Sequence, residues 1–391
     1  MAVSLLLRSD AVQDPGKEVN ALVLVLANPD LFARLSMKIC FLIHDMTARG
    51  GMERTQANLA NALMASGETI SVWSCFRTRS SPGFEVSSEV KLFYSRRNPL
   101  PFFLDYPWLI CAFTFHVMRS RPRWVICTGA NTLVVALLGI LVPGVRLAVW
   151  EHFALSHSLT KARGRLTRRL ASVFASRIVT LTESDAEAWT KLYAPSGTVR
   201  VIPNIVTLHP LERTPRRQEV LAMGRLVPQK GFDLLLQAWS GAVKQLPGWS
   251  LRIVGDGPTR DQLVRLADDL GIKESVTFAS FSENPSILYS ECGLFVLSSR
   301  FEGMPFVLVE AMICGTPCIS FDCPNGPREL IHDGINGVLI PAERVDALAG
   351  AIVELGRNPA KRDQLGEAAR SVSEQFSQTR VLAQWQEILR D

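Results

Sequence analysis

One stretch of the sequence constrains the fold most strongly: residues 294–321, LFVLSSRFEGMPFVLVEAMICGTPCISF. It begins with a short apolar run, Leu294–Leu297, which is typical of a buried parallel strand. Pro305 can open a helix at its first position, and Gly315 can close that helix. A second apolar run, Cys318–Phe321, follows directly. The stretch therefore predicts a strand, a loop, a helix and a strand, the repeating unit of a parallel α/β sheet.

Polar groups gather at the loop and the helix start within this unit. A helix N-terminus at the carboxyl edge of a parallel sheet offers free N–H groups and a partial positive charge, which suit a phosphate. Glu302 lies in the loop and Glu310 on the helix. A carboxylate can accept two hydrogen bonds at once, which suits a pair of neighbouring sugar hydroxyls. Taken alone, the two acids are equally compatible with an incidental spacing.

A second polar loop follows another predicted strand, Glu219–Met223. It reads GRLVPQKG over Gly224–Gly231 and precedes a predicted helix that starts at Phe232. Arg225 supplies a planar fork of donors and Lys230 a compact charge, and together they can neutralise a diphosphate. With Glu302 and Glu310, which form an E-x7-E pattern, this loop resembles the retaining, nucleotide-sugar-dependent glycosyltransferases of the GT-B fold, family 4 (glycosyl transferases group 1) type, and in particular the members that build bacterial surface polysaccharides.

The resemblance runs from Met37 to the end of the chain and has its most specific motifs over residues 222–341. It implies an α/β GT-B fold, with two Rossmann-like parallel-sheet domains facing a central cleft. We expect an N-terminal extension over 1–36, an acceptor domain over 37–208, a donor domain over 209–375, and a C-terminal helix over 376–391 that returns to the first domain. The Pro- and Arg-rich stretch His209–Arg217 is the hinge candidate.

The first domain repeats the pattern of strand, glycine-containing loop and helix. A predicted strand over Met37–Ile43 leads to Gly50-Gly51, where the absence of side chains lets the backbone approach a ligand. A later predicted strand, Val145–Trp150, leads to His152. The resemblance implies that Gly51 faces the donor phosphates and that His152 reaches the transferred sugar. A tight turn and a structural histidine remain the alternative interpretations.

The resemblance also implies a role for each remaining site residue. Arg225, Lys230, Glu302 and His152 are expected to act in catalysis. After the predicted strand Val276–Phe278 the family usually has a glycine, which this chain lacks, so main-chain groups at Phe281 and Ser282 become the candidates that hold the base. The expected donor-binding residues are Gly50, Gly51, Gly303, Met304, Pro305, Phe306, Glu310, Phe281 and Ser282.

Charge is distributed unevenly along the chain. The net charge is +5, but residues 1–200 carry +9 (23 basic against 14 acidic residues), and residues 201–391 carry −4 (19 against 23). Five bases without an acid lie close together: Lys161, Arg163, Arg165, Arg168 and Arg169. They are expected to contact an anionic membrane surface or the diphosphate of an acceptor, and a merely solvated helix face is the alternative. No nucleic-acid motif accompanies them.

Two apolar segments bear on membrane contact. The segment Leu100–Met118 is expected to form a buried helix or an amphipathic helix that touches lipid. The segment Thr132–Val142 is expected to form a buried helix, since it is too short to span a bilayer. No stretch of about 18 purely apolar residues occurs.

The eight cysteines form no C-x-x-C pair and no zinc-type cluster with histidine. Scattered thiols of this kind fit a reduced, cytoplasmic protein, at most peripheral on the inner face of the cytoplasmic membrane. No D-x-D motif occurs, so we expect neither a metal nor another cofactor, and Arg225 and Lys230 replace a metal as the positive charge at the phosphates.

The sequence thus predicts a metal-independent hexosyltransferase that uses a nucleotide diphosphate sugar, with a UDP-hexose favoured, and a lipid-linked oligosaccharide acceptor. Two alternatives remain open: a non-catalytic nucleotide-sugar-binding module of the same architecture, and a sugar-nucleotide epimerase. Release of nucleoside diphosphate only when acceptor is present separates the transferase from both.

Overall fold

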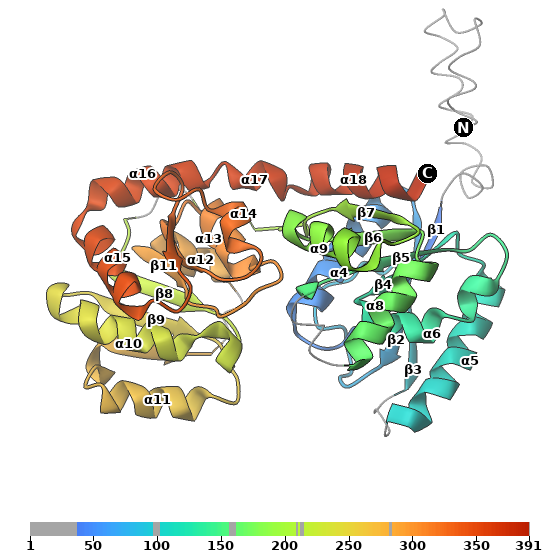
Figure 1. Cartoon of the computed structure of the whole chain (residues 1–391), viewed down its shortest axis with the longest axis horizontal. Coiled ribbons are helices and arrows are strands. Elements are labelled where there is room, and N and C mark those ends of the chain that lie inside the picture. Colours follow the sequence, from blue (N-terminus) through green and yellow to red (C-terminus); the bar gives the residue numbers. More distant parts are fainter. Residues whose placement is uncertain are drawn as a thin grey trace, which may run out of the picture.

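The computed structural model describes residues 37–96, 102–155, 162–208, 210–211, 215–280 and 284–390. Within them the chain forms two α/β domains, each built on one parallel sheet (Figure 1). The predicted extension over 1–36 lies outside the described residues, as does part of the predicted hinge. The predicted fold class is confirmed.

The first domain contains a seven-stranded sheet in the order β3-β2-β1-β4-β5-β6-β7. Side chains of β1 alternate between two apolar clusters, with Ile39 and Phe41 in one and Cys40 and Leu42 in the other, so both faces of the sheet are covered. The strands are β1 (Lys38–Asp45), β2 (Thr69–Phe76), β3 (Lys91–Arg96), β4 (Trp124–Thr128), β5 (Arg146–Trp150), β6 (Arg177–Thr180) and β7 (Thr198–Val201). The main helices are α4 (Gly51–Ala65), α5 (Phe102–Ser120), α6 (Leu133–Ala136), α8 (Ala162–Phe174) and α9 (Glu183–Tyr193).

The second domain contains a six-stranded sheet in the order β10-β9-β8-β11-β12-β13. The chain starts at β8, builds outward to one side, and then crosses to β11 on the other side. The strands are β8 (Glu219–Met223), β9 (Ser250–Val254), β10 (Val276–Ala279), β11 (Leu294–Leu297), β12 (Cys318–Asp322) and β13 (Val338–Pro341). The helices are α10 (Phe232–Ala242), α11 (Arg260–Asp269), α12 (Pro285–Glu291), α13 (Phe306–Ile313), α14 (Pro327–Leu330), α15 (Val345–Arg357), α16 (Pro359–Ala369) and α17 (Val372–Gln375).

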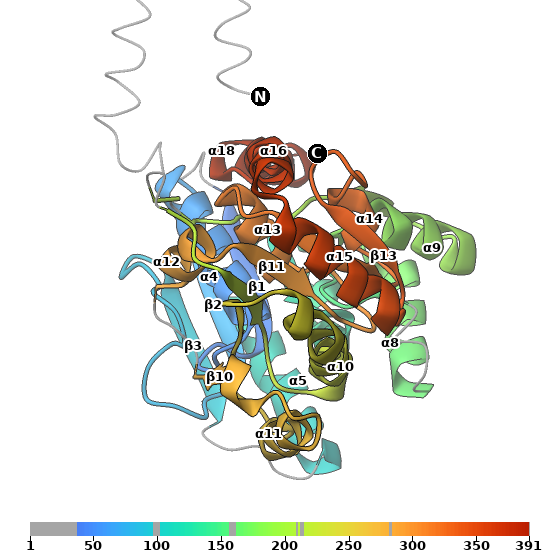
Figure 2. The same cartoon turned by 90° about the vertical axis from the view of Figure 1, so that its left-hand side faces the viewer.

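The last helix, α18 (Gln378–Arg390), joins the two domains. In Figure 1, α16, α17 and α18 form a row along one side of the molecule, running from the second domain to the first, and Figure 2 shows α16 and α18 together at that same side. Trp385 is fully buried, with its ring centroid 5.1 Å from that of Trp150. Trp124 Nε1 donates to the Leu389 carbonyl at 2.7 Å. One apolar cluster therefore continues through α18 from one domain into the other.

The prediction of a buried helix over Thr132–Val142 is wrong. Helix α6 covers only Leu133–Ala136, with short 3₁₀ turns before and after it. Gly139 lies in the second of these turns, where the lack of a side chain lets it pack on α5 and also weakens a helix. Leu141 is 71% exposed, so the end of the segment lies at the surface.

Helix α5 has one buried and one exposed apolar face. Leu109, Phe113 and Val117 are buried, whereas Trp108 and Phe115 are 53% and 67% exposed. The expected burial of this segment is confirmed for one face of the helix, and the other face presents apolar side chains to the outside; the predicted contact with lipid stays a prediction. Over the described residues, no helix combines the length and the apolar character that crossing a membrane requires.

Candidate active site

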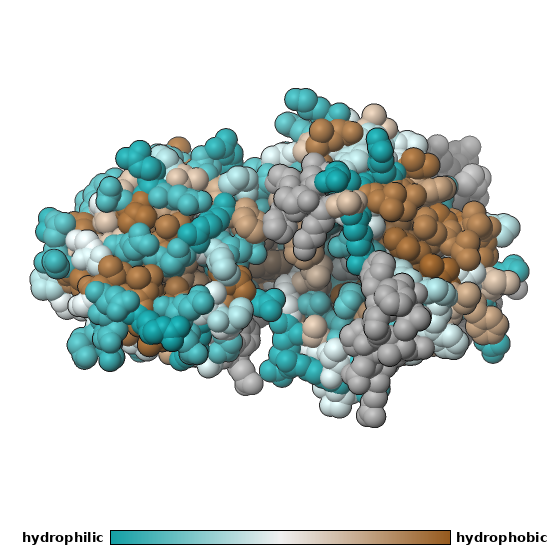
Figure 3. Space-filling model, turned by 60° about the horizontal axis from the view of Figure 1, so that its bottom comes forward, coloured by the Kyte–Doolittle hydropathy of each residue, from teal (hydrophilic) through white to brown (hydrophobic). Residues whose placement is uncertain are grey.

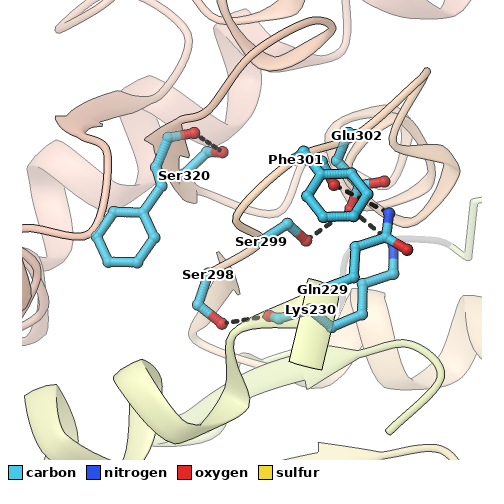
Figure 4. A network of polar contacts seen from close by, with 8 residues as sticks. Gln229, Lys230, Ser298, Ser299, Phe301, Glu302 and Ser320 are labelled. Atoms are coloured by element: carbon cyan, nitrogen blue, oxygen red, sulfur yellow. Dashed lines mark hydrogen bonds and ion pairs between the residues drawn. The ribbon is translucent and has the colours of Figure 1, made fainter. Parts of the chain in front are cut away.

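The two polar loops found in the sequence meet at the switch point of the second sheet. Lys230 follows β8 and Glu302 follows β11, and these two strands are neighbours. In a parallel sheet the carboxyl ends of neighbouring strands lie at the same edge, and ligands bind where the strand order reverses. The Lys230 Nζ lies 2.6 Å from the Glu302 Oε1, and the Ser299 hydroxyl donates to the same oxygen at 2.6 Å (Figure 4).

Backbone contacts fix the position of Lys230. Gly231 has φ of +62°, and an added Cβ there would lie 2.0 Å from the Ser298 carbonyl oxygen, so only glycine fits. The Ser298 hydroxyl donates to the Lys230 carbonyl at 3.0 Å. Gln229 Nε2 donates to the Phe301 carbonyl at 2.9 Å (Figure 4). These contacts tie the loop after β8 to the loop after β11.

Arg225 lies on the same loop but points outward. Its neighbour Leu226 donates its N–H to the Asp256 carbonyl at 2.9 Å, which anchors the loop on the turn after β9. Arg225 itself is exposed and forms no ion pair with any acid that the structure describes. Its guanidinium is therefore available to an anionic ligand.

Glu310 lies on α13 and is almost fully buried. Its Oε2 accepts from the Tyr289 hydroxyl at 2.9 Å, and its Oε1 lies 2.6 Å from the Arg54 Nη1. Arg54 belongs to α4 in the first domain, so this ion pair bridges the two domains. Burial raises the pKa of Tyr289, and the Glu310 carboxylate raises it further, which keeps the phenol protonated as a donor.

The helix that carries Glu310 begins beside the loop that carries Glu302. Pro305 is its N-cap residue, and no side chain caps the first turn of α13. The first N–H groups of a helix have no partner within the helix and favour an anion. Gly303 touches the other domain, since a Cβ there would lie 2.6 Å from the His152 carbonyl oxygen.

His152 follows β5 and packs with its ring 4.5 Å from that of Trp150. Its Nε2 is buried and has no hydrogen-bond partner among the described residues. Burial lowers the pKa of His152 to about 3, so the imidazole is neutral at physiological pH. Gly51 begins α4, and a Cβ built on it would meet no atom within 4 Å. The structure therefore leaves open space beside Gly51, whereas a Cβ on Gly50 would lie 2.6 Å from the Glu53 Oε2.

The cluster of five bases does not form one surface. Arg168 is buried, and its Nη2 lies 2.6 Å from the Glu151 Oε2 in a fully buried ion pair. The assignment of Arg168 to a membrane or acceptor surface is therefore wrong. The helical spacing of the bases could not show that Arg168 is buried, because its partner Glu151 lies directly after β5, in a distant part of the sequence. Arg163 contacts the ring and the hydroxyl of Tyr106. Lys161 lies outside the described residues.

The other two bases of α8 line a surface cavity. Arg165 and Arg169 are exposed, and with four residues of α8 and α9 they enclose about 520 Å³; those four are Ala162, Leu166, Leu192 and Tyr193. Leu166 and Leu192 are 58% and 56% exposed. Figure 3 shows that exposed apolar atoms gather on the half of the molecule that the first domain forms. The cavity thus combines two cations with apolar walls.

Several residues with contacts in this region were given no role by the sequence. Arg54 and Tyr289 both contact Glu310, but they carried no signal because they are distant from it along the chain: Tyr289 lies 21 residues away, and Arg54 belongs to the first domain. The expected base-binding residues Phe281 and Ser282 lie outside the described residues. Among those described, no three His, Cys, Asp or Glu side chains come together as metal ligands.

Comparisons with known proteins cover most of the chain. Residues 49–209 match the family model described as Glycosyltransferase Family 4, and residues 210–372 match the one described as Glycosyl transferases group 1. An uncharacterized glycosyltransferase of Haemophilus influenzae is 28% identical over 90% of this chain and 99% of its own length. The amylovoran biosynthesis glycosyltransferase AmsD of Erwinia amylovora is 27% identical, with the same coverage. The lipopolysaccharide 1,6-galactosyltransferase of Salmonella typhimurium is 27% identical over 80% of this chain and 88% of its own length.

Solved structures share the architecture at low sequence identity. Staphylococcus aureus TarM, solved in a complex that includes UDP, superposes with a TM-score of 0.79 at 15% identity, covering 91% of this chain and all of TarM. HepE of Anabaena, solved with UDP and glucose, gives 0.75 at 20% identity, covering 90% of this chain and 99% of HepE. These similarities show the fold of the chain.

Proposed function

Because this chain belongs to the GT-B glycosyltransferases, with a family 4 domain followed by a group 1 domain, we propose that it is a retaining hexosyltransferase of surface-polysaccharide assembly. The proposed donor is a nucleotide diphosphate sugar, with a UDP-hexose favoured, and the proposed acceptor is a sugar hydroxyl of a lipid-linked oligosaccharide. The ion pair of Lys230 and Glu302 at the switch point carries this proposal. The names of AmsD and of the lipopolysaccharide galactosyltransferase support the assignment to surface polysaccharides.

The difficult step is the departure of the nucleoside diphosphate. As the bond between the sugar C1 and the phosphate oxygen breaks, negative charge builds on that oxygen. Lys230 and the uncapped N-terminus of α13 supply fixed positive potential in that region, and the exposed Arg225 of the same loop would add its charge when it turns to the diphosphate. Donors of this kind contribute about 3 kcal/mol each to transition-state stabilisation. Glu302 orients Lys230 and accepts from the sugar with its remaining oxygen.

Retention of configuration follows if the acceptor attacks from the side that the diphosphate leaves. The acceptor oxygen bonds to C1, and its proton passes to the departing phosphate oxygen. His152 is neutral and its backbone lies against Gly303 in the loop that carries Glu302, so its imidazole is proposed to hydrogen-bond the transferred sugar without carrying a charge. A double-displacement route would need a carboxylate nucleophile, and Glu302 is already held by Lys230 and Ser299.

Glu310 is the proposed ligand of the ribose hydroxyls. In this structure Arg54 contacts one of its oxygens, so a ribose that binds there has to displace Arg54. Arg54 lies in the first turn of α4, beside the glycine pair, so that the released guanidinium can turn to the donor phosphates. Donor binding would then replace the ion pair of Arg54 with Glu310 by a contact of Arg54 with the donor phosphates.

The cavity between α8 and α9 is the proposed contact for the lipid-linked part of the acceptor, at the inner face of the cytoplasmic membrane. Arg165 and Arg169 match the charge of a phosphate or an anionic headgroup, and Leu166 and Leu192 match an acyl or isoprenoid chain. The exposed apolar side chains of α5 lie in the same domain and extend this face.

The test of the function is a donor screen followed by a transfer assay. The protein is heated with UDP-glucose, UDP-galactose or GDP-mannose, and a donor present at 100 times its Kd should stabilise it by about 2.7 kcal/mol. The preferred donor is then incubated with lipid-linked oligosaccharide. Nucleoside diphosphate should appear only with acceptor, and the product should carry the sugar with the donor's anomeric configuration. Binding without release identifies a non-catalytic module, and conversion of the donor to its epimer identifies an epimerase.

The proposed reaction needs no metal, because the cations of the site are side chains. We expect excess EDTA to leave the rate of transfer within about twofold of its value in Mg²⁺. A rate that falls with EDTA and returns when Mg²⁺ or Mn²⁺ is added would contradict this part of the proposal.

A further inference from the structure

A carboxylate of the second domain caps a helix of the first. Glu329 lies on α14, and its Oε2 accepts from the Glu183 N–H at 2.9 Å, while its Oε1 accepts from the Ser184 N–H at 3.0 Å and the Ser184 hydroxyl at 2.7 Å. Glu183 and Ser184 are the first two residues of α9. Their N–H groups have no partner within the helix, and the helix dipole favours a negative charge at this end.

A second contact joins the same two segments. Asn325 Nδ2 donates to the Asp185 Oδ1 at 3.2 Å, and this oxygen also accepts from the Leu155 N–H at 3.0 Å. Leu155 lies three residues after His152, on the segment that follows β5. Asp185 therefore holds the backbone of the His152 segment and at the same time contacts the second domain. Burial raises the pKa of Asp185 to about 6, and the nearby charge of Glu329 adds to this rise.

The segment that carries Asn325 and Glu329 also packs on the loop of the donor site. The Glu302 N–H donates to the Pro324 carbonyl at 3.4 Å. A Cβ added to Gly326, whose φ is +87°, would lie 2.6 Å from the Pro305 ring. Contacts thus run without a break from the Glu302 loop through Asn325 and Glu329 to α9, and from Asp185 back to the His152 segment.

We propose that Glu329 and Asn325 form an interdomain latch that couples closure of the cleft to the placement of His152. Glu329 is a positioning residue: it touches neither donor nor acceptor, and it acts by docking α9 against the donor domain. Capping by Glu329 is possible only when the domains are closed, because its partners lie on the other domain. The effect on the rate of transfer depends on the proposed function, whereas the capping contact does not.

The contact is tested by hydrogen exchange, which requires no activity. In Glu329→Gln the side chain keeps its size but loses its charge and one acceptor, so at least one N–H at the start of α9 loses its partner. We expect amide exchange in a peptide covering residues 181–186 to speed up at least tenfold, and exchange in α10 to stay unchanged. Glu274→Gln, an exposed acid of the same domain, is the matched control. Unchanged exchange at the start of α9 would overturn the latch.

The positioning role is tested by kinetics with the full-length protein. We expect Glu329→Gln to lower kcat at least tenfold while the donor KM changes less than threefold, because the proposed donor ligands Lys230 and Glu310 belong to the second domain and none of the latch contacts involves their side chains. Ser184→Ala removes the hydroxyl, which is one of the three groups that donate to Glu329. Its effect on kcat should be smaller in the Glu329→Gln background than in the unmodified protein. If exchange speeds up but kcat equals that of Glu274→Gln, the positioning role is wrong. If the unmodified protein transfers no sugar, the proposed function fails, while the exchange result still decides the latch.

Discussion

At the scale of single residues, Lys230 shows how the site is assembled from local rules. A left-handed glycine places Lys230 at the end of β8, and the neighbouring strand supplies Glu302 and Ser299. A half-buried lysine held by one carboxylate has a defined position and keeps N–H donors for a phosphate. The residue thus combines preorganisation with charge.

Replacement of Lys230 tests this role directly. We expect Lys230→Ala to lower kcat/KM by two to three orders of magnitude, as loss of one preorganised donor does. Lys273→Ala is the control, since Lys273 forms a surface pair with Asp268 at 3.5 Å. Transfer rates and thermal unfolding are measured for both variants. A drop of less than threefold for Lys230→Ala, with the fold intact, would show that Lys230 does not stabilise the leaving group.

His152 makes the pH dependence of stability testable. Its pKa is lowered in the folded protein, so the unfolded chain binds the proton more readily, and stability falls as the pH falls below about 6.5. Between pH 7 and pH 5 this single residue should cost about 2 kcal/mol. Urea unfolding at both pH values should show a smaller loss for His152→Gln than for the unmodified protein. An equal loss would mean that His152 is not held neutral by burial.

At the scale of elements, helix α8 separates two kinds of arginine. Arg165 and Arg169 lie four residues apart on the exposed face, while Arg168 points to the sheet and meets Glu151. Removing one partner of a buried ion pair leaves an uncompensated charge, which is strongly destabilising. Two arginines next to each other in the sequence therefore have different roles.

We expect Arg168→Met to reduce the free energy of unfolding by about 3–5 kcal/mol. Arg169→Met, one residue further along the same helix, should change it by less than about 0.5 kcal/mol. The double variant Glu151→Gln/Arg168→Met should regain much of the loss, because it leaves no unpaired charge. Denaturant unfolding of the four proteins decides this, and equal effects at 168 and 169 would contradict the buried pair.

At the scale of the whole molecule, the net positive charge and most of the large exposed apolar side chains belong to the first domain. The cavity between α8 and α9 and the exposed side chains of α5 belong to this domain. The second domain carries the proposed donor site and a net negative charge. This division suits a protein that meets an anionic surface with one domain and a soluble donor with the other.

Sedimentation with lipid vesicles tests whether the first domain binds an anionic membrane surface. The protein should bind vesicles containing phosphatidylglycerol and leave pure phosphatidylcholine unbound. Arg165→Glu/Arg169→Glu should weaken binding at least tenfold, since each base near an anionic surface contributes about 1 kcal/mol. The control Lys244→Glu/Arg265→Glu reverses two exposed charges of the second domain. Equal losses in both variants would indicate an unspecific effect of net charge and contradict the proposed surface.

The sequence alone determined the alternation of strands and helices, because each buried strand is a short apolar run and each helix end is marked by glycine or proline. β8 and β11, for example, have the predicted bounds. It also singled out Lys230, Glu302 and Glu310, since these residues follow strands whose carboxyl ends share one edge. The sequence did not predict that the helix expected over Thr132–Val142 is interrupted, with a short 3₁₀ turn at Gly139.

Only the tertiary structure decided the contacts between distant segments. Arg54 forms an ion pair with Glu310, Arg168 forms one with Glu151, and Glu329 accepts from Ser184; in each pair the two residues belong to different elements of the fold. A charge shows its sign in the sequence, but whether it is buried and what neutralises it depends on the packing of strands and domains. For this reason the two polar loops of the second domain could be recognised in the sequence, whereas the coupling of the two domains could not.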